Sequence, residues 1–106
     1  MTTVEQTKFR RTKAWKSWRE YMKSVQGGKC YITGSKLRKT SQLHHLDPKH
    51  YDLLEQERFV FLLSSMHDVI HAIYRYYRKD KTVIDRITEV LEKMYQYEIE
   101  GEEYDE

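Results

Sequence analysis

The sequence predicts an α+β fold, mostly helical, in which a two-stranded hairpin and the helix after it are flanked by an N-terminal and a C-terminal helix. Apolar residues recur at spacings of three and four in three segments, which is the period of a helix with one buried side. Residues 41–45 and 59–63 are predicted to form two short strands separated by a polar loop, and the second run is apolar and rich in strand-forming residues. Pro48 ends the first strand, because proline has no N–H to contribute to a sheet.

The first predicted helix runs from Lys8 to Val25 and has an apolar side and a basic side. Trp15 and Trp18 belong to the apolar side, so we expect them to lie in the core. The basic side consists of Lys13, Lys16, Arg19 and Lys23. These side chains can follow a phosphate backbone or remain an ordinary solvated helix face. Gly27-Gly28 ends the helix, since glycine readily adopts the left-handed conformation found there.

The segment between this helix and the hairpin is short and basic. Residues 30–34 are predicted to form a strand that runs into a turn. Residues 35–42 are expected to form a loop with three basic residues, Lys36, Arg38 and Lys39. These residues extend the candidate surface for nucleic acid.

A helix from Ser64 or Ser65 to about Arg78 is predicted to have one side buried in the core and a neighbouring side that carries candidate site residues. Its buried side contains Met66, Ile70, Ile73 and Tyr77. The neighbouring side contains His67, His71, Tyr74 and Arg78, at spacings of four, three and four. Tyr74 and Arg78 therefore either contact a phosphate or a base, or are ordinary surface residues.

The last predicted helix, over residues 82–95, has an apolar side that we assign to ordinary core packing. Residues 98–106 contain six acidic residues and little that is apolar. We expect a disordered tail there, after a single domain formed by residues 1–97.

The composition is that of a small, highly charged protein of 106 residues with a net charge of +2. Residues 1–49 hold 12 basic and 3 acidic residues, a charge of +9, and residues 50–106 hold 7 and 14, a charge of −7. This asymmetry favours a polyanionic partner, although two solvated faces would give the same pattern. Cys30 is the only cysteine, so a reducing, cytoplasmic compartment is expected. We find no membrane span, which needs roughly 18 apolar residues.

Four of the five histidines lie in two short runs, 44–45 and 67–71. His67 and His71 are four residues apart, so both imidazoles project from one side of the predicted helix. His44 and His45 point in opposite directions on a strand, so one can be a third metal ligand and the other a general base. Phosphodiester hydrolysis requires three things: a metal ion, a base that activates water, and basic groups that bind the phosphate backbone.

In these features the sequence resembles the HNH endonucleases, the ββα-metal family, and in particular its small phage members, over about residues 29–74. The resemblance implies that His45 is the general base and that Pro48 is the proline of the family's His-x-x-Pro motif. It also implies that one divalent ion is bound by His44, His67 and His71.

Two positions depart from the family pattern. Arg58 stands where the family has an asparagine that ties the loop between the strands, and arginine offers donors only. Arg58 can grip a phosphate instead, or another residue can fix the loop. Thr33 stands where the family's Cys-x-x-Cys-Gly knuckle, begun here by Cys30, has its second cysteine. No structural zinc is expected, because such a site needs four ligands.

The expected function is metal-dependent endonuclease cleavage of double- or single-stranded DNA with low sequence specificity, with His45 and Arg58 as the catalytic residues. Three imidazoles favour Zn, Ni or Mn over Mg, which prefers oxygen ligands, with Mg as the alternative. We expect no membrane partner, and a homodimer as an alternative to a monomer. A phage-encoded protein of this kind would act in the host cytoplasm.

Two other hypotheses remain open. An inactive HNH-fold module would bind nucleic acid or a protein partner without cleaving DNA. A structural zinc protein would hold one ion with Cys30 and the histidines together. Cleavage that EDTA stops and that His45→Ala lacks would exclude the inactive module.

Overall fold

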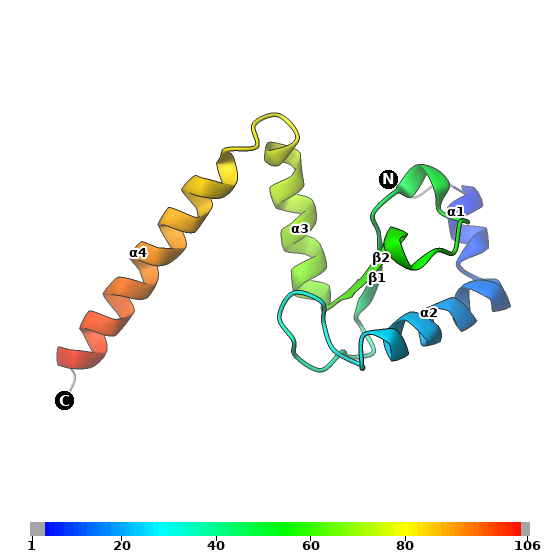
Figure 1. The fold of residues 1–106 in the computed structure, drawn as a ribbon, viewed down its shortest axis with the longest axis horizontal. Coiled ribbons are helices and arrows are strands. Elements are labelled where there is room, and N and C mark those ends of the chain that lie inside the picture. The colour runs from blue at the N-terminus through cyan, green and yellow to red at the C-terminus, as the bar shows by residue number, and fades with distance from the viewer. Residues whose placement is uncertain (1–3, 105–106) are drawn as a thin grey trace. The chain divides into compact units, whose positions relative to one another are not determined.

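The computed structural model of this chain describes residues 4–104 (Figure 1). Its main elements are α1 (Val4–Phe9), α2 (Lys13–Val25), β1 (Gln42–His45), β2 (Phe59–Leu62), α3 (Ser64–Tyr77) and α4 (Val83–Tyr104). Two short 3-10 turns, η1 (Pro48–His50) and η2 (Gln56–Arg58), lie between the strands. The α+β fold class is therefore confirmed. The chain divides into two compact units, residues 1–69 and 70–106, whereas the sequence predicts one domain over 1–97.

The N-terminal segment forms two helices rather than the single helix predicted from Lys8 to Val25. α1 ends at Phe9, and Thr12 is the N-cap of α2, its hydroxyl oxygen accepting the Trp15 N–H at 3.2 Å. Thr12 has φ −75° and ψ 155°, an extended conformation through which a helix cannot continue. The predicted end of α2 is confirmed, since Gly27 follows with φ +64°.

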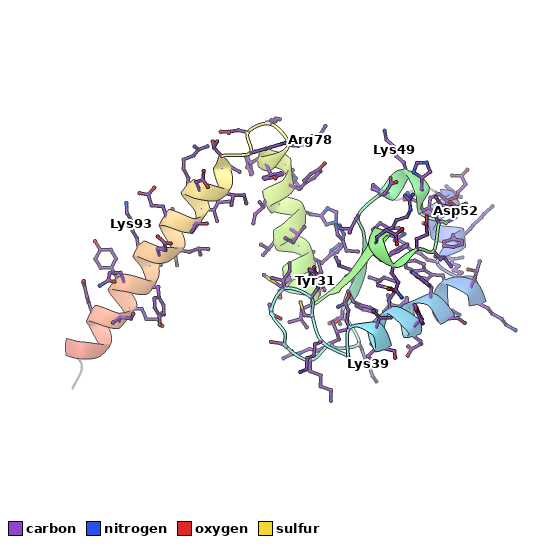
Figure 2. All side chains as sticks on the ribbon, in the orientation of Figure 1. Tyr31, Lys39, Lys49, Asp52, Arg78 and Lys93 are labelled. Carbon is purple, nitrogen blue, oxygen red and sulfur yellow. The ribbon has the colours of Figure 1, made fainter. Side chains whose placement is uncertain are left out.

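Residues 29–36 form a turn, where the sequence predicts a strand over 30–34. One antiparallel bridge joins Lys29 to Lys36. The Gly34 N–H donates to the Cys30 carbonyl at 3.0 Å, and Gly34 has φ +73°, which glycine adopts without strain. Tyr31 projects from the turn and is 70% exposed (Figure 2). Local hydrogen bonds in this turn take the place of a strand ladder.

β1 and β2 form the predicted antiparallel hairpin, with His44 opposite Val60 and His45 opposite Phe59. Successive side chains of a strand point to opposite faces of a sheet. His45 and Phe59 therefore share the face that carries the core of the first unit. His44 points to the other face.

Most of the core of the first unit lies between this hairpin and α2, and alternation along β2 places Leu62 on the face of His44. Its buried apolar residues are Trp15, Met22, Cys30, Leu37, Leu43, Phe59, Phe61 and Leu62. Trp15 and Phe59 have ring centroids 5.8 Å apart, so α2 packs directly on β2. The prediction that Trp15 is a core residue is confirmed, and Trp18 is half-buried beside it.

The Cys30 side chain belongs to this core and is 2% exposed. Burial raises the pKa of its thiol, but hydrogen bonds from Thr33, Leu63 and Ile32 outweigh burial and lower the pKa from 9.0 to about 7. Thr33, which stands where the family's knuckle has its second cysteine, is thus a hydrogen-bond partner of Cys30.

We expect the thiolate absorbance of Cys30 to titrate with a midpoint near 7. Because this pKa lies below the ordinary value of 9.0, the unfolded chain binds more protons, and stability should rise by about 2 kcal/mol between pH 7 and 9. The stabilisation is complete above the unfolded pKa and is lost as the pH falls through the folded one. Urea unfolding of the wild type and of Cys30→Ala across this range measures the difference. A midpoint near 9 would contradict the hydrogen-bonded thiolate.

The second unit, residues 70–106, contains the rest of α3 and the whole of α4. α4 runs to Tyr104, so it extends into the acidic segment for which the sequence predicts a disordered tail. Residues 105–106 lie outside the described residues. None of the helices within residues 4–104 has the combination of length and apolarity that crossing a membrane requires.

The apolar side of α4 is not core, contrary to the prediction from its spacing. Val90, Leu91 and Met94 are 57, 58 and 63% exposed. On α3, Ile70 and Ile73 are half-buried and Tyr77 is 37% exposed. No side chain over residues 70–101 is fully buried, so spacing predicted the amphipathic helices correctly but not their burial.

Candidate metal centre

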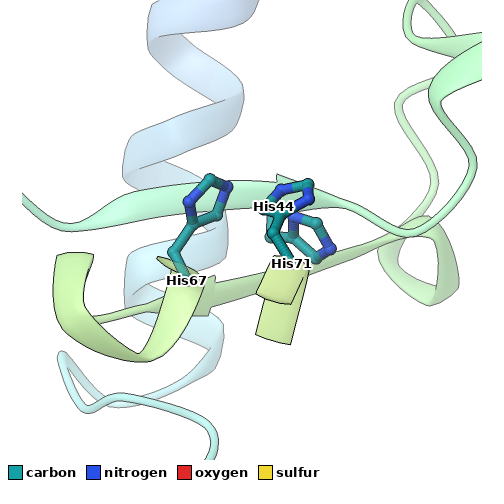
Figure 3. A group of neighbouring side chains, drawn as sticks. All are labelled: His44, His67 and His71. Atoms are coloured by element: carbon teal, nitrogen blue, oxygen red, sulfur yellow. The ribbon is translucent and has the colours of Figure 1, made fainter. Parts of the chain in front are cut away.

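Three histidines lie together: His44 from β1, and His67 and His71 from α3 (Figure 3). One imidazole nitrogen of each lies within 4.8 Å of the other two. The rings of His44 and His67 are edge to face, with centroids 5.0 Å apart and planes at 80°. His44 and His67 are half-buried and His71 is exposed, so the cluster has one side open to solvent. The structure thus brings together the three residues that the sequence predicts as ligands.

Local structure explains why these histidines meet. β2 leads directly into α3 through Leu63, whose carbonyl accepts the His67 N–H at 2.9 Å. His71 follows one turn later on the same unbroken helix, so both rings project from one side of it. β1 pairs with β2, and His44 lies on the face of the hairpin away from the core. A strand that joins a helix with a one-residue connection therefore determines the geometry of the cluster.

The donor set suits a borderline divalent ion. Imidazole nitrogens bind zinc at about 2.0–2.1 Å, which places two bound nitrogens roughly 3.3 Å apart in a tetrahedral site. Separations of up to 4.8 Å reach that value after small side-chain rotations. Three protein ligands leave a position for water or substrate, as in catalytic zinc sites. Among the described residues this group does not include Cys30, which disfavours a structural zinc shared by Cys30 and the histidines.

His45 lies on the opposite face of β1 from the cluster. Its ring stacks on Trp15, with centroids 5.1 Å apart and planes at 6°, and packs against Phe59 at 4.9 Å. Its Nε2 is buried and has no hydrogen-bond partner in the part of the chain that the structure describes. Nδ1 is the ring nitrogen left to interact with the Tyr51 backbone, which acts to raise the pKa of His45. An imidazole that donates from Nδ1 to a carbonyl keeps the Nε2 lone pair as a proton acceptor.

Burial lowers the pKa of His45 below its ordinary value of 6.5, and the positive charge of Arg10 acts in the same direction. The hydrogen bond to the Tyr51 backbone opposes both effects but does not reverse them. The ring is therefore neutral at pH 7, as a general base must be. The same stacked position would also serve a packing role, and the kinetics of His45 variants distinguish the two.

Arg58 fixes the loop between the strands, whereas the sequence suggested a phosphate contact for it. Its Nη1 donates to Asp47 Oδ2 at 2.7 Å, and its Nε donates to Glu55 Oε1 at 2.8 Å. Its carbonyl accepts the Leu46 N–H at 2.8 Å. Arg58 thus ties the two ends of the loop together through Asp47, while Glu55, three residues before it, holds the guanidinium locally.

Asp47 is a residue that the sequence predictions above do not name, although Arg58 and His50 both pair with it. Its Oδ2 also lies 2.8 Å from His50 Nδ1. Hydrogen bonding to His50 contributes most to lowering the pKa of Asp47, and Arg58 lowers it further. The signal was present in the sequence: Asp47 and Arg58 carry opposite charges just outside two strands that pair antiparallel.

The basic residues of α2 and of the loop after it meet at one pocket of the first unit. The pocket has a volume of about 200 Å³ and is lined by Arg19, Glu20, Lys23, Leu37, Arg38, Lys39 and Phe61. The Arg19 guanidinium lies 5.1 Å from the centre of the Phe61 ring. Four of the predicted nucleic-acid contacts are thus brought together. The others in this unit, Lys13, Lys16 and Lys36, are exposed and lie outside the pocket.

Tyr74 and Arg78 belong to the second unit. Tyr74 lies on α3 and is 57% exposed, and Arg78 follows the last residue of α3 and is exposed (Figure 2). Their exposure is compatible with the predicted contacts to nucleic acid.

Comparison of the chain with protein-family models, with curated proteins and with solved structures found no match. The function of the cluster is therefore argued from its own geometry and chemistry.

Proposed function

We propose that this chain is an HNH-type endonuclease that hydrolyses phosphodiester bonds in DNA with low sequence specificity. The observation that carries the proposal is the grouping of His44, His67 and His71, with nitrogens within 4.8 Å of one another. They come from a hairpin strand and from the helix after it, the order expected for a ββα-metal site. Low specificity is proposed because lysine and arginine side chains on this surface would contact phosphates, which carry no sequence information.

In this proposal the three clustered imidazoles hold one divalent ion, with Zn, Ni or Mn favoured by the nitrogen ligands. Once bound, the ion neutralises charge on the attacked phosphate and on the leaving oxygen. His45 is assigned as the general base, a role that requires its buried Nε2 on the core face of β1 to become accessible to the attacking water. Stacking on Trp15 fixes the orientation of the ring.

Substrate binding is assigned to the basic surface of the first unit. The pocket between α2 and the following loop, with Arg19, Lys23, Arg38 and Lys39 in its wall, can accept a phosphate group. Binding through such contacts should weaken steeply as salt is added. Arg58 is assigned to positioning, because it fixes the loop whose backbone holds His45.

Purified protein should nick supercoiled plasmid DNA in the presence of Mn or Ni, and EDTA should stop the reaction. His45→Ala is expected to lower the cleavage rate by roughly 10²–10⁴-fold, the contribution of a general base, with metal affinity unchanged. Rates of nicking in the same metal give the comparison. Equal rates would contradict the role of His45, and a wild type that cleaves with none of Mn, Ni, Zn or Mg would contradict the nuclease proposal itself.

Two further variants separate chemistry from folding. His45→Phe keeps an aromatic ring on Trp15 but has no proton acceptor, so it should be folded and inactive. His50→Ala removes an exposed histidine outside the cluster and should cleave at the wild-type rate. An active His45→Phe would assign His45 to packing alone.

A non-catalytic nucleic-acid-binding module is the second candidate, and the burial of His45 Nε2 favours it. In that case His45 only packs against Trp15, and the basic pocket accounts for DNA binding. The module would retard labelled DNA in a gel without cleaving it in any of the four metals. Its binding would not change in His45→Phe.

A further inference from the structure

A largely exposed apolar stripe follows the length of α4. It consists of Val83, Ile87, Val90, Met94 and Tyr97, spaced by four, three, four and three residues. This alternation is the one that brings side chains onto a single seam between paired helices. Val90, Met94 and Tyr97 are 57, 63 and 73% exposed. Methionine and tyrosine are enriched in protein interfaces, and so the stripe has the composition of a contact surface.

We propose that this stripe pairs with the same stripe of a second copy of the chain, with the two α4 helices antiparallel. The stripe spans 15 residues, or about 21 Å at the rise of an α-helix. In an antiparallel pair the two alternating positions of such a seam face each other, so Ile87 of one copy would lie opposite Val90 of the other, and Val83 opposite Met94. The two-fold axis would pass between residues 88 and 89.

Charge along the chain selects both the occupant and its orientation. Residues 78–86, which form the turn before α4 and its first residues, hold four basic and two acidic residues, a charge of +2, and residues 89–103 hold one basic and six acidic residues, a charge of −5. Antiparallel pairing sets the positive segment of each copy against the negative segment of the other. Parallel pairing would set like charges side by side. The chain is therefore complementary to itself in one orientation only.

The polar residues beside the stripe fit the rim of such an interface. Arg86 pairs with Asp80 at 2.7 Å and Lys93 with Glu89 at 2.9 Å, so these charges are held beside the apolar line and not on it. A two-fold interface uses one surface patch on both copies and leaves none unpaired. The predicted assembly is thus a closed dimer.

The mass in solution tests this pairing. Light scattering or sedimentation should give twice the 13.0 kDa of the chain for the wild type. Val90→Glu combined with Leu91→Glu should raise the dimer dissociation constant by roughly a hundredfold or more, because charge replaces one apolar group in the middle of the stripe and another beside it. Thr88→Glu combined with Gln96→Glu adds the same charge on the other side of α4 and should leave the dimer intact.

Several outcomes would overturn the pairing. One is a wild type that is monomeric at every concentration. If the double variant Val90→Glu with Leu91→Glu also lowered the stability of that monomer, the stripe would be covered by the chain itself. Another is a dimer that survives the same double variant. A complex that forms only with a different protein would also exclude self-pairing.

Disulfide cross-linking tests the orientation. In a Cys30→Ala background, Val83→Cys mixed with Met94→Cys should give a cross-linked heterodimer under oxidation. Val83→Cys alone should remain uncross-linked, because antiparallel helices separate the two copies of this residue. Rapid cross-linking of Val83→Cys with itself would show parallel pairing and overturn the antiparallel arrangement.

Discussion

Replacing His67 with alanine is expected to remove stable metal binding and, with it, DNA cleavage. His67 provides one of the three clustered nitrogens, and its ring lies 5.0 Å from that of His44. The affinity should fall by roughly a hundredfold or more, since losing even a hydrogen-bond partner of a ligand typically costs 10–100-fold. Isothermal titration with Zn or Ni measures this directly, without relying on activity. Metal should also raise the melting temperature of the wild type and not of the variant.

Two matched variants keep this result specific. His50→Ala removes a histidine of η1 that pairs with Asp47 at 2.8 Å and should bind metal as tightly as the wild type. Asp52→Ala removes an exposed carboxylate that is not part of the cluster and should have little effect. Wild-type affinity in His67→Ala would mean that the ion binds elsewhere, and the nuclease proposal would lose its central observation.

The hairpin and the histidine cluster could be predicted from the sequence because both depend on short-range rules. Strand-forming residues at 59–63 and a proline after 41–45 mark two strands, and β1 and β2 match them within one residue at each end. A spacing of four places His67 and His71 on one side of any helix. Alternation along a strand separates His44 from His45 in the same way.

Other features depend on contacts that periodicity does not report. The apolar spacing of α4 is that of a helix with one buried side, but spacing does not say whether the chain itself supplies the cover. The helical period also continues across residues 10–12, where capping by Thr12 starts a new helix. The tie from Arg58 to Asp47 follows from strand pairing, which brings the two ends of the loop together.

Trp15→Ala is expected to lower the free energy of unfolding by about 3–5 kcal/mol, the usual cost of removing a large aromatic side chain from a core. Trp15 is 4% exposed, and its ring lies 5.1 to 5.9 Å from those of Phe9, His45 and Phe59. Domains are typically stable by only about 5–15 kcal/mol, so the variant should keep little of its stability. Urea unfolding followed by circular dichroism measures the change.

Tyr31→Ala is the control for Trp15→Ala, because Tyr31 is an aromatic residue that is 70% exposed and should change stability little. Trp15→Phe keeps an aromatic ring at the contact and should remain folded. Trp15 contacts His45 on the core face of β1, whereas His44 points to the other face. Trp15→Phe should therefore lower the cleavage rate without changing metal affinity. If Trp15→Phe lowered both the cleavage rate and the metal affinity, α2 would also support the metal cluster. The two faces of the hairpin would then not act independently.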